Sequence, residues 1–387
     1  MVEEVLFQIT KEHLDTGLRG FPVGYCTTST VDPHKGLFYG KEPVSSVDNW
    51  EPERVMFLLY SGHDGSPQEL SAFKQELKKR AALSQETIRH IESLPRKGHP
   101  MALFSAALLI AGMIEGKGDY REDCLDLIAK IPELTATLIN YHAGWGKTLP
   151  SRDLGYMDNF SQMLNVPGGK DPKLHHVFKL FNVLHYDHGG GNLSTFVGKA
   201  VASGQEDMYG SIAAAMNALA GPLHGRANQE CLHFVKEFLE KLGAEAAETD
   251  VEALLRQKLA NKELIFGFGH AVLRVEDPRA TVQYELAKHY YPEDPLVKMA
   301  LMLRRAGTQV LKENPKIANP YPNVDAISGT LLTVAGFPYP DYYTVLFGMS
   351  RTVGIAIQIV YERLEARGKK GTPIVRPKYI YKERDTP

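Results

Sequence analysis

The sequence predicts a protein built mainly from α-helices, with very little β-sheet. Apolar residues recur at helical spacing through most of the 387-residue chain, which is the pattern of helices that bury one face. Strand-like alternation is confined to residues 5–10 and 375–381. Prolines and glycines fall between the periodic segments, where helices are expected to begin and end. We therefore expect an all-α fold.

The helical segments can be placed in chain order from their apolar periodicity. Four prolines stand where helices would begin, since proline is tolerated in the first helical turn, and three consecutive glycines are expected to end another helix. These residues are Pro67, Pro132, Pro172 and Pro295, and Gly189, Gly190 and Gly191. The clearest predicted helices are residues 55–60, 70–77, 174–184, 208–219, 297–311 and 342–364.

Length and charge narrow the class of protein. A chain of 387 residues corresponds to two or three domains of about 150 residues each. No long linker or repeat separates them, so the best boundary candidates are the turns at residues 221–222 and 336–340. With 44 basic and 46 acidic residues, no positive field supports non-specific nucleic-acid binding. We expect a globular protein without a nucleic-acid partner.

Cysteine usage and the start of the chain bear on the compartment. Cys26, Cys124 and Cys231 lie far apart with no C-x-x-C pair, which argues against a disulfide framework and a cysteine zinc site. The chain starts Met-Val-Glu-Glu, without a basic or apolar leader, so a cytoplasmic protein is expected. The apolar segment 102–114 is too short for the roughly 20 residues that cross a bilayer, and no membrane partner is expected.

One motif, G-P-L-H-G-R-A-N-Q-E at residues 221–230, predicts a histidine at a helix N-terminus. Pro222 stands just before His224, and helix-forming residues follow. The positive end of the helix dipole disfavours a charged imidazole there, and a neutral ring can donate a hydrogen bond. A capping or packing histidine is the alternative.

A second motif, G-F-G-H-A-V-L-R-V-E-D-P-R at residues 267–279, begins like a dinucleotide fingerprint. It lacks the third glycine and any βαβ context, which weakens that interpretation. A glycine-lined turn that gathers His270, Arg274 and Arg279 is better described as an anion site, because arginine suits bidentate contact with carboxylates and phosphates. A solvated turn with surface arginines is the alternative.

The segment H-Y-D-H, residues 185–188, places His185 and His188 one helical turn apart. Two such histidines can bind a metal, yet no third or fourth ligand is evident nearby. We therefore expect no metal site.

A carboxylate and two arginines complete the candidates. Asp325, in P-N-V-D-A-I-S-G, lies among small and apolar residues, where partial desolvation can raise its pKa and suit it to act as a base. A helix cap is the alternative. Arg351 follows an apolar run and Arg376 lies in V-R-P-K, and either alone would be taken for a surface residue.

Taken together and in chain order, the motifs resemble citrate synthase. The segments are H-Y-D-H-G-G-G-N, G-P-L-H-G-R-A-N-Q-E, G-F-G-H-A-V-L-R-V-E-D-P-R, P-N-V-D-A-I-S-G, Y-Y-T-V-L-F-G-M-S-R and V-R-P-K, and the similarity runs from about Thr27 to Lys378. L-A-G-P-L-H-G with A-N-Q-E is closer to the eukaryotic, dimeric type than to the NADH-regulated hexameric bacterial type. The resemblance implies a nearly all-α homodimer with the active site in a cleft between two domains. The implied large domain is residues 1–225 with 337–387, and the small domain is residues 226–336.

The resemblance also implies roles for individual residues. His224, His270 and Asp325 match the catalytic residues. The implied oxaloacetate ligands are His188, His224, His270, Arg279, Arg351 and Arg376, the last reaching in from the partner subunit. The implied CoA contacts are Leu264, Ile265, Phe266, Gly267, Phe268, Gly269, Arg274 and Asn323. Phe266 stands where the family commonly has proline and Arg226 where it has glycine or leucine, so the CoA loop is expected to differ in shape or charge.

The implied activity is the condensation of acetyl-CoA with oxaloacetate and water to give citrate and CoA, without a metal ion or other cofactor. A 2-methylcitrate synthase that uses propionyl-CoA is the alternative within the family, because one methylene is worth only about 1–3 kcal/mol of discrimination. Outside the family, the alternatives are a non-catalytic helical metal-binding protein built on His185 and His188 and a nucleotide-dependent oxidoreductase.

Overall fold

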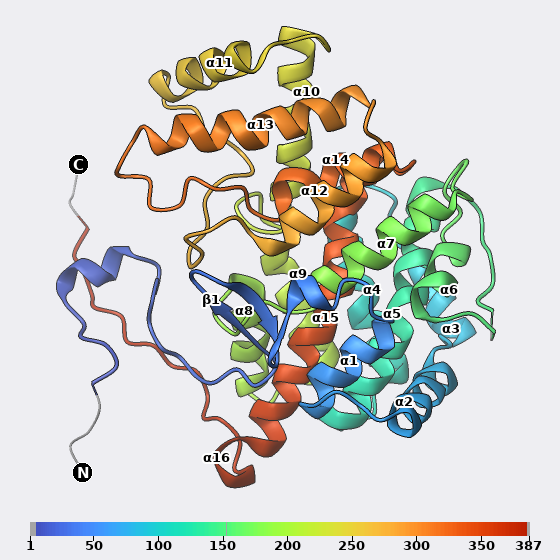
Figure 1. The fold of residues 1–387 in the computed structure, drawn as a ribbon. Helices are drawn as coiled ribbons and strands as arrows, with labels where there is room; N and C mark the ends of the chain where they lie inside the picture. The colour runs from blue at the N-terminus through green and yellow to red at the C-terminus, as the bar shows by residue number, and fades with distance from the viewer. Residues whose placement is uncertain (1–4, 152, 385–387) are drawn as a thin grey trace.

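The computed structural model describes residues 5–151 and 153–384, and it is mostly helical (Figure 1). The all-α prediction is confirmed. The α-helices are α1 (Pro52–Ser61), α2 (Pro67–Arg80), α3 (Gln85–Ile91), α4 (Pro100–Glu115), α5 (Tyr120–Ala143), α6 (Tyr156–Met163), α7 (Pro172–Leu184), α8 (Leu193–Ser203), α9 (Met208–Leu219), α10 (Ala227–Leu242), α11 (Glu248–Ala260), α12 (Pro278–Tyr290), α13 (Pro295–Lys312), α14 (Asp325–Val334), α15 (Tyr343–Val360) and α16 (Ala366–Lys369). Short 3₁₀ turns are η1 (Lys11–Asp15), η2 (Val44–Ser46) and η3 (Pro340–Tyr342), and η4 (Tyr361–Glu365) is a π-helical turn.

The β-structure is a small antiparallel sheet near the start of the chain. Its strands are β1 (Ser29–Asp32), β2 (Gly36–Tyr39) and β3 (Glu42–Pro43), in that order. The strands predicted at residues 5–10 and 375–381 are wrong, because both segments are irregular. Their apolar side chains, such as those of Ile9 and Tyr379, are exposed. Alternation gives a segment one apolar face, but a strand also needs a neighbour to pair with.

The helix starts at three of the four prolines are as predicted. Pro67, Pro172 and Pro295 are the first residues of α2, α7 and α13. The helix start predicted at Pro132 is wrong, since Pro132 lies inside α5. An internal proline costs a helix about 3 kcal/mol or more, and α5 buries most of its residues against the core, which offsets that cost.

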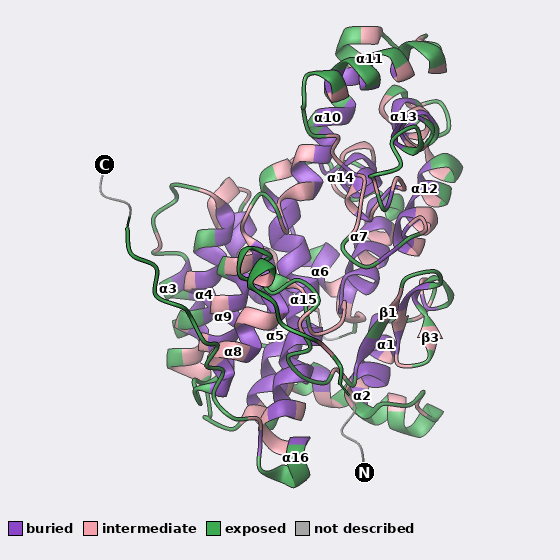
Figure 2. Cartoon of the chain, turned by 90° about the vertical axis from the view of Figure 1, so that its left-hand side faces the viewer, coloured by how far each residue is buried: buried purple, intermediate pink, exposed green. Residues whose placement is uncertain are grey.

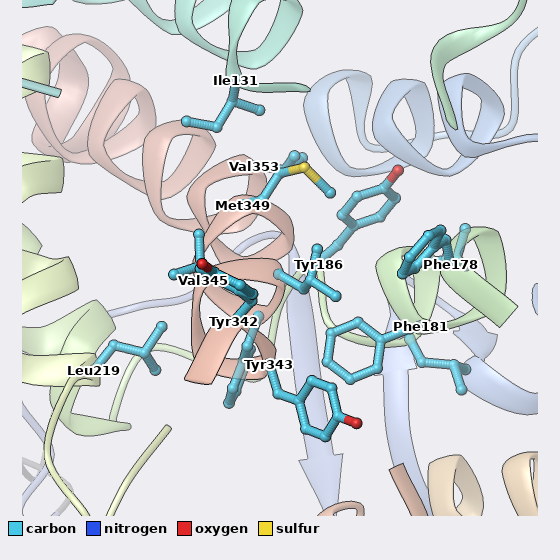
Figure 3. Close-up of a cluster of buried hydrophobic side chains, with 14 of the residues drawn as sticks. Ile131, Phe178, Phe181, Tyr186, Leu219, Tyr342, Tyr343, Val345, Met349 and Val353 are labelled. Atoms are coloured by element: carbon cyan, nitrogen blue, oxygen red, sulfur yellow. The ribbon is translucent and has the colours of Figure 1, made fainter. Parts of the chain in front are cut away.

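A single buried helix, α15, forms the centre of the core. All of its residues from Tyr343 to Val360 are buried. Figure 3 shows Val345, Met349 and Val353 of α15 among buried side chains from several other helices and from the loop after α7. The helical stretch Pro340–Lys369 is long and apolar enough to cross a membrane, but its apolar window lies entirely inside the protein. We conclude that α15 is a core helix.

The last five helices before α15 pack mainly on one another at one end of the molecule. In Figure 1, α10, α11, α12, α13 and α14 gather at the top, above the helices that surround α15. Helix α10 packs on α13 and α14, α11 on α13, and α14 also contacts α7. Figure 2 shows the same group set apart from α3, α4, α5 and α9, with buried residues running down the middle of the molecule.

The small sheet touches the group of helices at the top. The backbone N–H of Arg274 donates to the carbonyl of Pro33, in the turn between β1 and β2, at 2.7 Å. At the start of β2, Gly36 lies so close to Pro278 that a Cβ there would stand 2.3 Å from the proline ring. The hairpin therefore rests on the loop before α12 and on its first turn.

Candidate active site

The segment that carries His188 lies along one face of α15. Arg351 Nε donates to the carbonyl of His185 at 3.0 Å, and the N–H of Gly354 lies 3.1 Å from the carbonyl oxygen of Tyr186. A Cβ on Gly354 would stand 2.4 Å from that oxygen, so only glycine permits this approach. Since α7 ends at Leu184, the prediction that residues 185–188 are helical is wrong. The segment is an irregular loop whose backbone carbonyls accept from α15 instead of continuing α7.

His188 follows directly, beside His270. The two rings lie 5.1 Å apart, centroid to centroid. His188 Nε2 is buried and has no hydrogen-bond partner among the described residues. Burial, followed by the charge of Arg279, lowers the pKa of His188 well below its usual value. This imidazole is therefore neutral at physiological pH, with one nitrogen left for a ligand.

The loop before His270 is held against the segment that leads into α14. The N–H of Asn323 donates to the carbonyl of Gly267 at 2.9 Å, and the N–H of Gly269 to that of Tyr321 at 3.1 Å. The side-chain amide of Asn323 donates to the carbonyl of Gly269 at 3.1 Å. Gly267 and Gly269 have φ of 81° and 84°, a region that favours glycine. These contacts place His270 near Asp325.

Hydrogen bonds also settle which nitrogen of His270 carries the proton. Its Nδ1 accepts from the N–H groups of Val272 and Leu273 at 3.0 and 2.9 Å. Burial, followed by the charge of Arg279, lowers the pKa of His270 to about 4. A neutral ring that accepts at Nδ1 carries its proton on Nε2, so Nε2 is a hydrogen-bond donor.

His224 has the opposite tautomer. It lies in the turn just before α10, and its Nε2 accepts from the N–H of Ser194 at 3.2 Å and lies 2.9 Å from the hydroxyl of the same residue. Burial, followed by the charge of Arg351, lowers the pKa of His224 to about 4. The neutral imidazole predicted from the motif is present, although burial is the main cause. Its proton is on Nδ1, which is free to donate.

Asp325 is the first residue of α14. Its Oδ1 is buried and accepts no hydrogen bond from the described part of the chain, and it does not cap the helix. Desolvation raises the pKa of Asp325 to about 7, against the opposing effect of Arg279. A carboxylate in this condition is a base suited to neutral pH.

Two buried arginines supply the positive charge of the site. Arg279 is paired with Asp277, with Nη2 2.7 Å from Oδ2. Arg351 Nε donates to the carbonyl of His185, and the guanidinium lies 4.9 Å from the centre of the Phe347 ring. Burial lowers the pKa of Arg351 to about 10, which leaves it charged at neutral pH. Both charges act on Asp325 and His188, so the four side chains form one cluster.

Two predicted residues lie apart from this cluster. Arg376 is exposed in the segment after α16, where the N–H of the preceding residue, Val375, donates to Ser203 Oγ at 2.9 Å. Arg274 is also exposed, and its guanidinium donates to the carbonyls of Val272 and Leu273 at 3.0 and 2.7 Å. Within the described chain, Arg376 makes no contact with the cluster, and Arg274 reaches it only through the backbone carbonyl of His270, to which its guanidinium donates at 3.4 Å.

The predicted CoA loop joins the cluster only at its end. Leu264 is 65% exposed, while Ile265 and Phe266 pack partly against the core. The rings of Phe266 and Phe234 lie 6.1 Å apart. A Cβ on Gly267 would stand 2.9 Å from Ala326, in the first turn of α14. The loop thus runs from the surface towards Asp325.

The geometry does not favour the two alternatives outside the family. His185 Nδ1 donates to the carbonyl of Phe181 at 2.7 Å, and its ring stacks on the Phe181 ring with the centroids 4.1 Å apart, so it is a core residue. In residues 5–151 and 153–384 no group of three or more histidine, cysteine or carboxylate side chains is arranged to hold a metal. The described sheet is antiparallel, whereas the dinucleotide motif requires a parallel βαβ unit.

The sequence argument missed Ser194 and Asp277. Ser194 fixes the tautomer of His224, and Asp277 pairs with Arg279 while capping α12. The spacing N-x-S before α8 and D-P-R before α12 signals helix starts. It does not signal which histidine or arginine those side chains also contact.

Known proteins resemble this chain over nearly its whole length. The mitochondrial citrate synthase of Citrus maxima is 36% identical, over 97% of this chain and 83% of that protein. Citrate synthase 4, mitochondrial, of Arabidopsis thaliana is 35% identical over the same shares. The solved ternary complex of citrate synthase from Thermoplasma acidophilum with carboxymethyl coenzyme A and oxaloacetate has a TM-score of 0.82 at 25% identity, covering 96% of both chains.

These relatives correct the prediction of a cytoplasmic protein, which is wrong. Both curated relatives are named as mitochondrial enzymes. The prediction depended on the composition of the first residues, of which residues 1–4 lie outside the described structure. The compartment is not a property of the folded core, so neither composition nor fold could supply it.

The family assignment agrees with the motifs and with the cluster of histidines, arginines and a carboxylate. A family model described as "Citrate synthase, C-terminal domain" matches residues 17–378. This match and the identities of the full-length relatives establish that the chain belongs to the citrate synthase family.

Proposed function

We propose that this chain condenses acetyl-CoA with oxaloacetate and water to form citrate and CoA. The observation that carries the proposal is the group formed by half-buried Asp325, neutral and half-buried His224 and His270, and two buried arginines. It supplies a base, two hydrogen-bond donors and an anion site, which are the groups the reaction needs. The reaction so written uses no metal ion and no other cofactor.

The first step is removal of a proton from the thioester methyl group. This carbon is a very weak acid, so a base succeeds only if the enolate oxygen is stabilised as its charge develops. Asp325, with its pKa raised to about 7, takes the proton. His224 donates from Nδ1 to the enolate oxygen, since Ser194 occupies Nε2.

The second step joins the two substrates. The enol carbon attacks the ketone carbon of oxaloacetate, and His270 donates from Nε2 to the ketone oxygen, because its Nδ1 already accepts two backbone N–H groups. His188, Arg279 and Arg351 bind the carboxylates and carbonyl of oxaloacetate. Water then hydrolyses the citryl thioester and releases CoA.

The acetyl-CoA contacts are proposed at the loop that ends beside Asp325. This loop comprises Leu264, Ile265, Phe266, Gly267, Phe268 and Gly269, with Arg274 and Asn323 next to it. Asn323 ties the carbonyl of Gly269, so it shapes the loop as well as lying near the thioester. Arg274 is exposed, and only its Nη1 donates to the neighbouring carbonyls, so its other donors are available for a phosphate.

We further propose two domains that close on the substrates: residues 1–225 with 337–387, and residues 226–336. His188, His224 and Arg351 belong to the first part, and His270 and Asp325 to the second. The packing of α10 to α14 chiefly on one another supports this division. Closure would exclude water from the enolate.

We also propose that the enzyme is a homodimer in which Arg376 completes the oxaloacetate site of the partner subunit. Arg376 is exposed, and among the described residues it makes no contact with the cluster of its own chain, which supports this proposal. The segments beside it expose large apolar side chains, including Ile374 and Ile380, which fits a surface that a second copy covers.

The activity itself is tested by thiol release. Purified, chelator-treated protein should release free CoA from acetyl-CoA only when oxaloacetate is present. Release from propionyl-CoA at a higher kcat/KM would instead identify a 2-methylcitrate synthase. Equal release without oxaloacetate would reduce the protein to a thioesterase and contradict the proposal.

Asp325 and His224 should act as one unit on the acetyl methyl group. General-base and oxyanion-type contributions are each worth roughly 10² to 10⁴ in rate. Steady-state kinetics should show kcat lowered by about that factor in Asp325→Asn and in His224→Ala. The double variant should lose far less than the product of both factors. A single variant with nearly wild-type kcat would show that the residue is wrongly assigned.

The pH profile should report Asp325. The base works only when ionised, so kcat/KM for acetyl-CoA should fall as the pH drops below about 7, where Asp325 becomes protonated. Because folding raises this pKa, the stability that Asp325 contributes is lost as pH rises through about 7. Denaturant unfolding should therefore show that Asp325→Asn gains more stability relative to the wild type at pH 8 than at pH 4. A kcat/KM for acetyl-CoA that stays constant from pH 8 to pH 5 would refute the assignment of Asp325 as the base.

Sharing of Arg376 can be tested by mixing two inactive variants. Truncating a buried arginine–carboxylate contact costs about 2–5 kcal/mol, so Arg376→Ala should be nearly inactive, like Asp325→Asn. After the two are mixed and refolded, one site of each heterodimer carries both defects and the other carries neither. Activity should return towards half the wild-type value per heterodimer. If Arg376 served its own chain, no activity would return.

A further inference from the structure

A chain of buried polar side chains leads from α8 and η4 to the segment that carries His188. Lys199 Nζ lies 2.9 Å from Glu362 Oε1 and donates to Gln358 Oε1 at 3.3 Å. Gln358 Nε2 in turn donates to Asp187 Oδ1 at 2.8 Å and to the carbonyl of Gly189 at 3.2 Å. The side chains of Lys199, Glu362, Gln358 and Asp187 are all buried.

The amide of Gln358 has only one orientation that satisfies its neighbours. A lysine ammonium can only donate hydrogen bonds, and an ionised carboxylate can only accept them. Gln358 stands between Lys199 and Asp187, so its oxygen must face the lysine and its NH₂ the aspartate. Lys199, held by Glu362, on one side and Asp187 with the carbonyl of Gly189 on the other therefore fix which way the amide points.

Gln358 holds the chain on both sides of His188. It binds Asp187 before the histidine and Gly189 after it. Ser29 completes the arrangement, because its hydroxyl accepts from the N–H of Gly189 at 2.7 Å and donates to Asp187 Oδ2 at 2.7 Å. With both neighbours fixed, the ring of His188 is held with its unpartnered Nε2 in the site.

Stability alone does not account for a buried ion pair at this position. Replacing such a pair with apolar residues of similar volume is often neutral or stabilising, because desolvation costs as much as the attraction returns. The pair contributes something that apolar side chains cannot, namely a fixed donor direction at Gln358. Arg351 and Gly354 contact the same segment from the same face of α15, so the segment is aligned at three successive points.

We propose that Gln358 is a positioning residue for oxaloacetate binding, which it controls through His188, and that the Lys199–Glu362 pair keeps it in register. The inference rests on the proposed function. A positioning role predicts a specific loss of oxaloacetate affinity, whereas a purely structural role predicts a loss of stability alone.

The test uses Gln358→Met, which keeps the length of the side chain and removes its hydrogen bonds, and Gln358→Glu, which keeps the contact with Lys199 but cannot donate when ionised. Both variants should raise KM for oxaloacetate tenfold or more, since hydrogen bonds to charged groups are lost. The kcat and the KM for acetyl-CoA should change less than threefold. Calorimetric titration with oxaloacetate alone should show the same loss of affinity.

Asn140→Leu is the matched control. Its buried amide also uses both atoms, donating to the carbonyl of Met163 at 2.8 Å and accepting from the N–H of Asn165 at 2.9 Å, but it lies on α5. This variant should lose stability and keep the wild-type KM for oxaloacetate. A rise in KM equal to that of Gln358→Met would overturn the proposal, as would an unchanged KM in both Gln358 variants.

A second route covers the case in which the Gln358 variants do not fold. Lys199→Met combined with Glu362→Met removes both charges and leaves Gln358 Oε1 without its donor, so the amide is held from one side only and KM for oxaloacetate should again rise. An unchanged KM would contradict the proposal. Absence of thiol release by the wild type would instead refute the proposed function, and the calorimetric comparison of wild type and variants would still decide the role of Gln358.

Discussion

The structure depends on the contact between α15 and the segment that follows α7. Helix α15 is buried along its whole length, so the face it turns towards residues 185–189 cannot shift without disturbing the core. Arg351, Gly354 and Gln358 lie on that face at helical spacing. Each contacts a different part of the segment. A helix buried along its whole length thus fixes the position of the segment that carries His188.

The second constraint is electrostatic. The site buries two arginines beside Asp325, and it places three histidines where desolvation keeps them neutral. An uncompensated buried charge is costly, yet Asp277 balances Arg279. The remaining positive charge suits a dianionic substrate. The packing of the surrounding core offsets the desolvation free energy of these groups. Electrostatic interactions in the site are strong because water is excluded.

Hydrogen bonds from backbone N–H groups give the two histidines proposed as catalytic different tautomers. His270 accepts at Nδ1 and His224 at Nε2. The two rings therefore present protons from opposite nitrogens, one suited to the ketone and the other to the enolate. This difference comes from a turn in one case and from the start of α8 in the other, so the chemistry is set by local backbone geometry.

The sequence by itself determined the helical class, three of the four helix starts predicted at prolines and the family, because these depend on local periodicity, on proline chemistry and on motifs that stand in order along the chain. Asp325 as a partly desolvated carboxylate was also predictable, since small and apolar neighbours surround it. The sequence could not supply the contacts between distant segments. Two predicted strands found no neighbour, Pro132 lies inside a helix whose burial outweighs its cost, and residues 185–188 are not helical because their carbonyls contact α15.

Only the tertiary structure decided the partners: Ser194 for His224, Asp277 for Arg279, and Gln358 for the segment around His188. Local sequence reports what one segment can form alone. Which side chains meet depends on how the segments pack, and that is a property of the whole chain.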